Sequence, residues 1–444
     1  MSARALTTLP KPKTPQLLGV LEYAFAPRRF AARNAKSLGR VYRVDGATGT
    51  IVVTSHPDHV KRVFAAAPET FDTFSQYTLG GIVGQRSVLV TAGDTHRRQR
   101  KLLAPPLTGA RLRAFAATMQ EIADRHVDAL TPGSELRALD LSTDFTLDVI
   151  VRTVFGVTEP EEAARLSSIL RAMVDEVPVL AVFQPRLQKA WFPPWQRYLQ
   201  ASQRFDGWLR AKLSERRQRE EKGEDVLSLL LQTRAEDASP LEYEELRDQL
   251  VTLLLAGHET TSIALASCIE YIHRHPDVLA RLQDELASEH SDPEAAQRNA
   301  YLGATIDETL RIAPILSDVT RRVREEFWLD DQLRLKAREG VMVLIEALHH
   351  DPELYPDPAQ FRPERFLERK FATYEYVPFG GGVRRCLGAA FSDYETKILL
   401  STILRGVNLE LRRERPDPRV RRNITLGPKY GVPLRVVKRR SIVR

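Results

Sequence analysis

The chain has little cysteine, with only Cys268 and Cys386 among its 444 residues. Two cysteines are too few for a disulfide framework or a four-ligand zinc site, so we expect reduced thiols, with that of Cys268 buried in the core. Long apolar runs are also lacking, because Glu22 interrupts the apolar patch at 17–26 and no window reaches the ~18 apolar residues of a membrane span. These absences predict a soluble, cytoplasmic protein without a signal peptide or a membrane anchor.

Glycine and proline are not abundant either, with 23 and 27 residues, and 43% of the chain is hydrophobic. This composition excludes a disordered, collagen-like or coiled-coil protein, and the chain is long enough to bury a core without disulfides. Lys and Arg outnumber Asp and Glu by 65 to 58, and residues 405–444 alone contain 13 basic and 3 acidic side chains. A basic balance can indicate nucleic-acid binding. Because this one comes from the C-terminal segment, we expect no nucleic-acid partner.

Hydrophobic periodicity predicts a mainly helical protein with a minor β component. Residues 40–46 and 50–55 are typical of a β-hairpin, the patterns from 57 to 312 are mostly helical, and a last helix is predicted over 387–405. The prolines of 351–366 exclude a regular helix in that stretch. Short β-like pieces are predicted at 327–331, 332–337, 341–348 and 424–440.

The strongest motif is F-G-G-G-V-R-R-C-L-G, residues 379–388, directly before the last predicted helix. Its three consecutive glycines let the backbone approach a flat ligand closely. Cys386 would lie at a helix N-terminus beside Arg384 and Arg385, where the helix dipole and the positive charges favour the thiolate. A single thiolate in a glycine-walled loop suits ligation of one metal in a cofactor, as in cysteine-ligated haem. The alternative is a glycine-rich turn before a helix, with a cysteine buried by chance.

A second motif interrupts the long apolar helix predicted around residues 250–268. Gly257 is costly in a helix interior, and the buried acid Glu259 needs a partner, so this segment breaks local rules at one place. An acid beside the hydroxyl of Thr260 can relay protons into a dry pocket. Equally compatible with the sequence, Thr260 bonds back to a carbonyl of its own helix while Glu259 reaches solvent.

Three weaker signals involve charged residues. Glu308 and Arg311 are three apart and share a helix face, although such a pair is often a surface ion pair. Arg365 follows in the segment F-R-P-E-R-F. His96 and Arg100 are four apart on a predicted helix and can together bind a carboxylate, unless that helix is a solvated basic surface.

Together, and in this order, these segments resemble the cytochrome P450 family of haem-thiolate monooxygenases over nearly the whole chain. The family loop F-x-x-G-x-R-x-C-x-G is the most specific element. The family motif A-G-x-[DE]-T-T is matched by 256–261, with Glu259 where many members have Asp. The loop is matched by Phe379, Gly382, Arg384, Cys386 and Gly388.

The resemblance implies a fold and a cofactor position. We expect a mainly α fold with a minor β component, in which haem b lies between the long central helix and the cysteine loop with the last helix. It implies one catalytic domain over 31–444 after an N-terminal extension, 1–30. Cys386 would be the axial iron ligand, and Phe379 would shield its sulfur. The other expected cofactor-binding residues are His96, Arg100, Ala256, Arg321, Gly380, Arg384 and Gly388, four of which (His96, Arg100, Arg321 and Arg384) would hold the haem propionates.

The resemblance also assigns the remaining motifs. Glu259 and Thr260 would protonate bound dioxygen. The resemblance does not decide whether Arg321 or Arg322 contacts the haem propionate. Glu308, Arg311 and Arg365 would form a buried charge triad that fixes the cysteine side of the fold.

Substrate contacts in the family come from segments that map to 70–92, 249–261, 315–320 and 424–430. The candidate residues are mostly apolar, which favours a lipophilic small molecule such as a fatty acid, terpenoid or steroid. They are Tyr77, Leu79, Ile82, Val83, Leu253, Ile315, Leu316 and Leu426.

The expected activity is that of a soluble, monomeric bacterial-type monooxygenase. Electrons would come from a separate ferredoxin-type donor, docked on Arg97, Arg98, Lys101 and Arg385. A peroxide-driven peroxygenase is an alternative, which the Glu259–Thr260 pair disfavours. A more remote alternative is a non-catalytic haem sensor that binds DNA through its basic tail.

Overall fold

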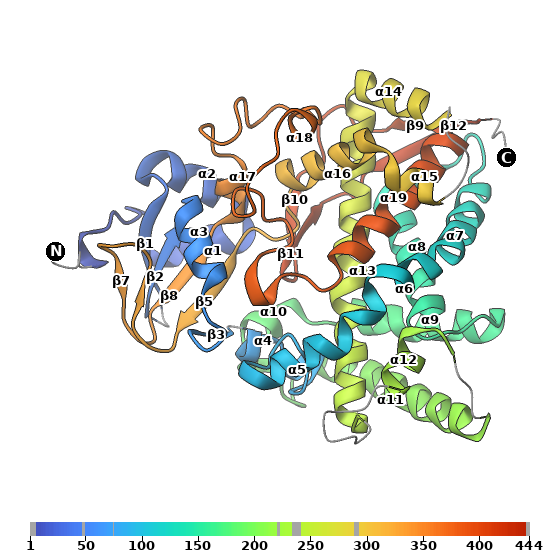
Figure 1. Ribbon diagram of the computed structural model, residues 1–444, viewed down its shortest axis with the longest axis horizontal. Helices are drawn as coiled ribbons and strands as arrows, with labels where there is room; N and C mark the ends of the chain where they lie inside the picture. Colours follow the sequence, from blue (N-terminus) through green and yellow to red (C-terminus); the bar gives the residue numbers. More distant parts are fainter. Residues whose placement is uncertain are drawn as a thin grey trace.

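The computed structural model describes residues 6–46, 49–73, 75–219, 223–232, 241–287 and 293–440. Helices dominate, as predicted, and gather on one side of the molecule, while most strands gather on the other (Figure 1). The first helices are α1 (Gln16–Phe25), α2 (Pro27–Leu38), α3 (Pro57–Ala65), α4 (Ser75–Val83), α5 (Gly93–Leu103), α6 (Gly109–Ala114), α7 (Ala116–Asp128), α8 (Ala138–Thr153), α9 (Pro160–Asp175) and α10 (Val179–Phe183). The later helices are α11 (Pro193–Arg219), α12 (Val226–Gln232), α13 (Tyr243–Arg274), α14 (Pro276–Ala287), α15 (Pro293–Arg298), α16 (Ala300–Ile312), α17 (Ile345–His349), α18 (Arg365–Glu368) and α19 (Ala389–Gly406).

Within the described residues the strands form four small sheets. The largest has the order β1-β2-β8-β5-β3, in which only β2 and β8 run parallel. The others have the orders β4-β12-β9, β10-β11 and β6-β7. The strands are β1 (Val41–Gly46), β2 (Gly49–Thr54), β3 (Phe71–Thr73), β4 (Glu135–Arg137), β5 (Val319–Val323), β6 (Phe327–Trp328), β7 (Arg334–Leu335), β8 (Gly340–Val343), β9 (Val407–Leu411), β10 (Arg419–Arg422), β11 (Thr425–Pro428) and β12 (Pro433–Arg439).

Several helices begin where the sequence supplies a capping side chain. Asn299 accepts the N–H of Leu302 at the start of α16, and Glu159 accepts two amides at the start of α9. His56 accepts the N–H of Asp58 before α3, where Pro57 takes the first helical position. These contacts satisfy amides that a helix end leaves without an internal partner.

Helix α13 is the centre of the helical part and crosses it from edge to edge (Figure 1). Apolar side chains of α7, α8, α16 and α19 pack with it in one buried cluster, here called the main apolar cluster. By length and composition α13 could cross a membrane, but 67% of its most apolar window is buried inside the protein. Its apolar character therefore serves the core.

Most of the predicted elements are present, but several boundaries differ, and the pieces predicted at 327–331 and 332–337 are strands of only two residues each. The predicted strand 341–348 is a strand only to Val343, because its parallel partner β2 ends at Thr54. The N–H of Leu344 donates to the Thr54 carbonyl, and the chain then turns into α17. The last helix begins at Ala389, two residues later than predicted.

Candidate active site

The cysteine loop is held on helix α3 by a backbone contact that only glycine permits. Gly382, the first residue of a short 3-10 turn, has a φ of 64°. A Cβ at this position would lie 1.7 Å from the carbonyl oxygen of Phe64. The loop closes on itself, since the N–H of Cys386 donates to the Phe379 carbonyl at 2.9 Å. Phe379 packs partly buried against the main apolar cluster.

Cys386 lies three residues before α19 begins and keeps contact with solvent, although protein atoms surround much of its thiol. Burial by the surrounding protein raises the pKa of its thiol, while the Gly388 N–H and the charges of Arg385 and Arg100 lower it. Burial has the larger effect, so the helix end and the neighbouring arginines, which were expected to favour the thiolate, do not outweigh it. A bound metal ion would supply the missing stabilisation, because the thiolate is the ligating form.

Four basic side chains from three separate segments meet beside this loop. We call His96 and Arg100 on α5, Arg321 on β5 and Arg384 before Cys386 the cationic cluster. Burial and the charges of the other three members lower the pKa of His96 to about 4. Burial lowers the pKa of Arg321 to about 10, and burial with the neighbouring charges lowers that of Arg384 to about 10. Arg321, rather than Arg322, is the strand residue whose charge acts on His96.

The cationic cluster has no carboxylate partner within the described residues. Arg384 donates to the Thr91 carbonyl at 2.7 Å, and Arg321 donates to its neighbouring carbonyl at 3.1 Å. Like charges that share a buried site repel each other and require an anion. A Cβ on Gly257, Gly380 or Gly388 would meet nothing within 4 Å, so the backbone is open at these three positions. The residues present therefore fit an anionic cofactor that would be held by the cationic cluster beside the Cys386 thiol.

The middle of α13 has features of both alternatives, a threonine bonded to its own helix and a segment open to a ligand. The hydroxyl of Thr260 donates to the Ala256 carbonyl at 2.7 Å, as expected of a threonine that bonds to its own helix. Ala256 and Gly257 are nevertheless exposed in the middle of a largely buried helix. Their exposure gives a ligand access to the helix backbone at this one place.

Glu259 lies under the hairpin formed by β10 and β11. Burial raises the pKa of its carboxyl, and the charge of Arg422 with contacts from Thr425 and Asn423 opposes the increase. The hairpin packs on α13 here, because a Cβ on Gly427 would lie 3.2 Å from Ile263. Glu259 is thus half-buried beside a basic residue and does not simply reach solvent. These hairpin residues carry no local sequence signal, since only the tertiary fold brings them to α13.

His258, between the two motif residues, turns away from this region. It is buried and shares a hydrogen bond of 2.8 Å between its Nδ1 and the hydroxyl of Thr146 on α8. Burial lowers its pKa to about 4. His258 therefore contributes to the packing of α13 on α8.

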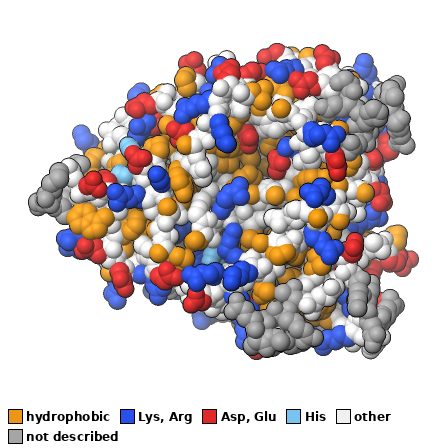
Figure 2. Space-filling model, viewed as in Figure 1, with side chains coloured by type: hydrophobic (Ala, Val, Ile, Leu, Met, Phe, Trp, Pro, Cys, Tyr) orange, Lys and Arg blue, Asp and Glu red, His pale blue; other side chains and the backbone are white. Residues whose placement is uncertain are grey.

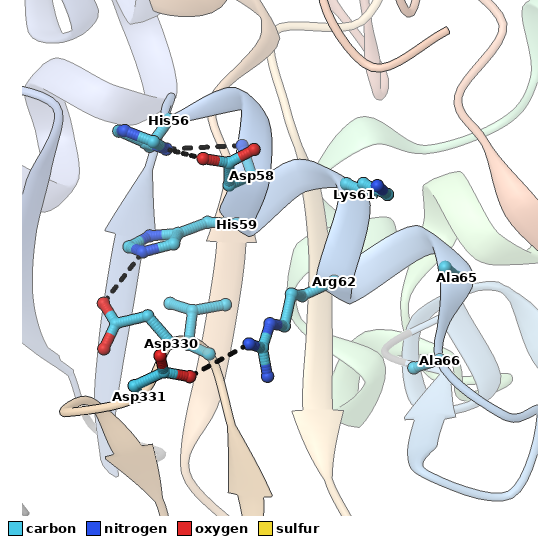
Figure 3. Close-up of a pocket in the computed structure, with 10 residues that line it drawn as sticks. His56, Asp58, His59, Lys61, Arg62, Ala65, Ala66, Asp330 and Asp331 are labelled. Atoms are coloured by element: carbon cyan, nitrogen blue, oxygen red, sulfur yellow. Dashed lines mark hydrogen bonds and ion pairs between the residues drawn. The ribbon is translucent and has the colours of Figure 1, made fainter.

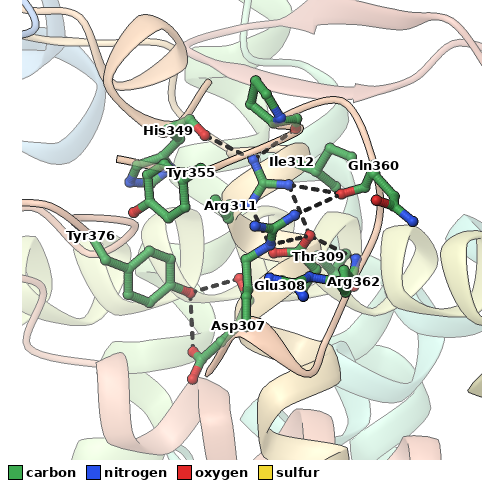
Figure 4. A network of polar contacts seen from close by, with 12 residues as sticks. Asp307, Glu308, Thr309, Arg311, Ile312, His349, Tyr355, Gln360, Arg362 and Tyr376 are labelled. Carbon is green, nitrogen blue, oxygen red and sulfur yellow. Dashed lines mark hydrogen bonds and ion pairs between the residues drawn. The ribbon is translucent and has the colours of Figure 1, made fainter. Parts of the chain in front are cut away.

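A buried ion-pair network joins α16 to the chain after α17 (Figure 4). Arg311 donates to the two carboxylate oxygens of Glu308 at 2.7 and 2.8 Å, and both side chains are fully buried. Arg365 donates to the same carboxylate at 3.0 Å. The structure therefore brings the three predicted triad residues together, and the alternative of a surface ion pair is wrong.

The remaining guanidinium protons of the triad bind the backbone of the proline-rich segment. Arg311 donates to the carbonyls of His349 and Pro358 at 2.8 and 2.9 Å. The N–H of Arg362 donates to Glu308 at 2.9 Å. A segment without regular secondary structure thus has its buried polar groups satisfied by two arginines and one carboxylate.

The candidate substrate residues separate into two groups. Leu253 and Ile315 are partly buried against the main apolar cluster, Leu79 against the cluster around α10 and α11, and Leu316 is half-buried. Two of the predicted segments meet, since the Leu426 N–H donates to the Ile315 carbonyl at 2.7 Å. The side chain of Tyr77 lies outside the described part of the structure.

Ile82 and Val83, also predicted as substrate residues, are buried side chains in this structure. Both are buried in a cluster with Trp195 and Tyr198 of α11, and the Tyr198 hydroxyl donates to the Ile82 carbonyl at 2.5 Å. Leu426 is also buried, and its backbone N–H is bound to the Ile315 carbonyl. Alternation of apolar residues cannot distinguish a core position from a pocket wall, because both are apolar.

Leu255 was not predicted from the sequence, although it lies on α13 just before the exposed segment. It is partly buried against both the main apolar cluster and the cluster around α10 and α11. Its position between two clusters makes it a further candidate for the apolar wall of the site.

A surface groove at the start of α3 lies apart from this site (Figure 3). His59 faces Asp330 at 3.0 Å, and Arg62 faces Asp331 at 3.2 Å. The groove shares no residue with the cysteine loop or the cationic cluster. Its charged groups pair with each other, so they do not form a second candidate active site.

Comparison with known proteins gives the family. The sequence model of cytochrome P450 matches residues 10–433. Cytochrome P450 135A1 of Mycobacterium tuberculosis is 33% identical over 99% of this chain and 98% of the relative, and cytochrome P450 135B1 of Mycobacterium bovis is 32% identical over 97% and 92%. The structure of retinoic acid-bound cyanobacterial CYP120A1 aligns with a TM-score of 0.83 over 94% of this chain and 95% of that one, at 23% identity.

The chain belongs to the cytochrome P450 family. The mainly helical fold with a minor β component is confirmed. Members of the family hold a haem iron through a cysteine thiolate and act as monooxygenases on small molecules, with electrons from redox partners.

Replacing Glu308 by Gln should strongly destabilise the protein. The substitution leaves two buried guanidinium groups without a counter-charge, which typically costs about 3–5 kcal/mol. The free energy of unfolding in urea measures the loss. Asp140→Asn is the matched control, since Asp140 forms an exposed i,i+3 pair with Arg137 at 2.7 Å and should lose less than about 1 kcal/mol. Equal losses for the two variants would contradict a special role of the triad.

Proposed function

We propose that this protein inserts one oxygen atom from dioxygen into a C–H bond, or across a C=C bond, of a lipophilic small molecule. The observation that carries the proposal is the exposed Cys386 thiol beside a cationic cluster with no carboxylate partner among the described residues. Haem b matches both features, with an iron for the thiol and two propionates for the cluster. When bound, the thiolate-ligated haem supplies the cleavage of the O–O bond.

The chain's own residues would bind and orient this group. The cationic cluster would hold the propionates by charge-assisted hydrogen bonds, which would also relieve the mutual repulsion of its members. The exposed backbone at Ala256 and Gly257 would face the ring from α13. Gly380, Gly388 and Phe379 would surround the sulfur of Cys386 on the other side.

Thr260 and Glu259 would move protons on the α13 side. The Thr260 hydroxyl donates its proton to the Ala256 carbonyl in this structure, so in the proposed relay it would rotate away from that carbonyl to pass the proton on. Burial raises the pKa of Glu259, which lets the carboxyl carry a proton closer to neutral pH. A peroxide-driven reaction would not need this pair, so we favour dioxygen as the oxidant.

The substrate would meet an apolar wall. Leu253, Leu255 and Ile315 are partly buried side chains near the exposed segment of α13. Apolar pockets with few polar groups bind lipophilic molecules. We propose a fatty acid, terpenoid or steroid as the substrate class.

We propose a ferredoxin-type protein as the electron donor, docked on the face that carries α5. Figure 2 shows this face, where Lys and Arg side chains gather over α5 and the loop before α19. Arg97, Lys101 and Arg385 are exposed, and the ion pair of Arg97 with Asp94 at 2.7 Å lies on the surface. Arg98 does not belong to this set, because its guanidinium turns inward and pairs with Glu245 of α13 at 2.5 Å. We further propose a monomer with one catalytic domain over 31–444, located in the cytoplasm.

The cysteine assignment predicts a spectroscopic result. The reduced, CO-bound protein should show the red-shifted absorption band of a thiolate-ligated haem, and Cys386→Ser should lose it. Cys268→Ser is the matched control, since that thiol is buried, and it should keep the band. A Cys386→Ser protein with an unchanged band would disprove the assignment.

The proton-relay proposal predicts uncoupling. Thr260→Ala should lower the product formed per electron pair by about tenfold or more, because a positioned proton donor typically contributes at least that much. Hydrogen peroxide or water should replace the product. Thr261→Ala removes the neighbouring hydroxyl, which faces Ser392 at 3.2 Å, and should stay coupled. Full coupling in Thr260→Ala would count against the relay.

The docking proposal predicts a charge-dependent rate. Reversing Arg97 and Lys101 to Glu should slow the first electron transfer by about tenfold at low ionic strength, and salt should reduce the difference. Stopped-flow reduction by a ferredoxin measures this rate. Reversing the exposed Arg435 and Lys438 of β12 changes the net charge equally and should leave the rate unaffected. Equal rates in all three proteins would refute the docking face.

A further inference from the structure

Helix α1 exposes an unusual number of large apolar side chains. None of its residues is buried. Apolar surface of this kind on one short helix indicates a binding surface, because single exposed apolar residues are common and clustered ones are not. The exposed fractions are 71% for Leu17, 55% for Leu18, 53% for Val20, 43% for Leu21 and 76% for Phe25.

The polar side chains of α1 face the protein instead. Glu22 is mostly buried and pairs with Arg33 at 2.6 Å, and the Tyr23 hydroxyl donates to Asp318 at 2.9 Å. Arg421 of β10 donates to the Ala24 carbonyl at 3.1 Å and lies over the Tyr23 ring. The helix is thus fixed with its apolar side outward, which is the reverse of the usual arrangement on a globular protein.

Positive charge flanks this apolar face. Residues 1–40 contain eight basic side chains and one acid, Glu22, so their balance is +7. Lys11 and Lys13 precede α1 and are exposed, and the side chain of Arg29, directly after it, is 82% exposed. The lone acid of the segment is already neutralised by its ion pairs.

An apolar helix face between exposed basic residues matches the interface of an anionic lipid bilayer. The acyl boundary accepts the apolar side chains, and the headgroups attract the lysines and arginines. A second copy of the chain is a poorer occupant, because a symmetric contact would place the exposed Lys11, Lys13 and Arg29 of two copies against each other. Nucleic acid would match the charge and leave the apolar face exposed.

We propose that α1 and its flanking basic residues form a docking surface for an anionic membrane. The contact lies on the surface of the bilayer and involves no membrane-spanning segment. Helix α1 is joined through Arg421 to the β10–β11 hairpin, which covers Glu259, so docking would bring the site close to the lipid phase. The further idea that substrate enters from the bilayer rests on the proposed function, whereas membrane docking itself does not.

Flotation of the full-length, haem-loaded protein with lipid vesicles tests the proposal. We expect binding to vesicles of phosphatidylcholine with phosphatidylglycerol, weaker binding at raised salt, and little binding to phosphatidylcholine alone. Leu17→Glu/Leu21→Glu should reduce binding at least tenfold, and Lys11→Glu/Lys13→Glu should reduce the preference for the anionic lipid. Val437→Glu on β12 is the matched control, since Val437 is 51% exposed, and it should bind like the unchanged protein.

Three outcomes would overturn the proposal. They are no binding of the unchanged protein to anionic vesicles, equal binding by the α1 variant, and a dimer in analytical ultracentrifugation that the α1 variant dissociates. The red-shifted CO band confirms that each variant is folded around its haem. Because flotation needs no turnover, its result is independent of whether the monooxygenase proposal holds.

Discussion

The buried carboxylate of Glu308 is the contact on which the cysteine side of the fold depends. It accepts hydrogen bonds from Arg311 and Arg365, and Arg311 also binds the His349 carbonyl. The ring of His349 in turn accepts the N–H of Val377 at 3.0 Å, two residues before the cysteine loop. A chain of buried polar contacts thus runs from α16 to the loop, so the position of Cys386 follows from a charge network far from it in sequence.

The Glu308 network and the cationic cluster differ in whether the chain supplies a counter-charge. The Glu308 network satisfies its two guanidinium groups with one carboxylate and several backbone carbonyls, all from the chain. The cationic cluster lacks an acid among the described residues, and burial together with the neighbouring positive charges lowers the pKa of His96 and of Arg384. The first group is complete without a ligand and supports the fold. The second becomes favourable only with an anionic ligand, as expected of a functional site that costs stability.

The sequence predicted the parts whose chemistry is local. The glycine loop, the threonine in α13 and the E-x-x-R pair each combine residue types at short spacing, and their positions in the structure match. Sequence reasoning failed where long-range packing decides. Arg98 could not be distinguished from Arg97, because only the position of α13 turns one inward to Glu245. Likewise, the burial of Ile82 depends on Tyr198 of α11, more than a hundred residues away.

The β10–β11 hairpin connects regions that the sequence leaves separate. Through Gly427 it lies on α13, through Leu426 it joins Ile315, and through Arg421 it holds α1. Its Arg422 also acts on Glu259, whose ability to carry a proton depends on that charge. A movement of this hairpin would therefore change the apolar wall of the site, the environment of the acid and the position of α1 together. Glu259 and the surface of α1 both contact this hairpin, so a change in the position of the hairpin would affect both.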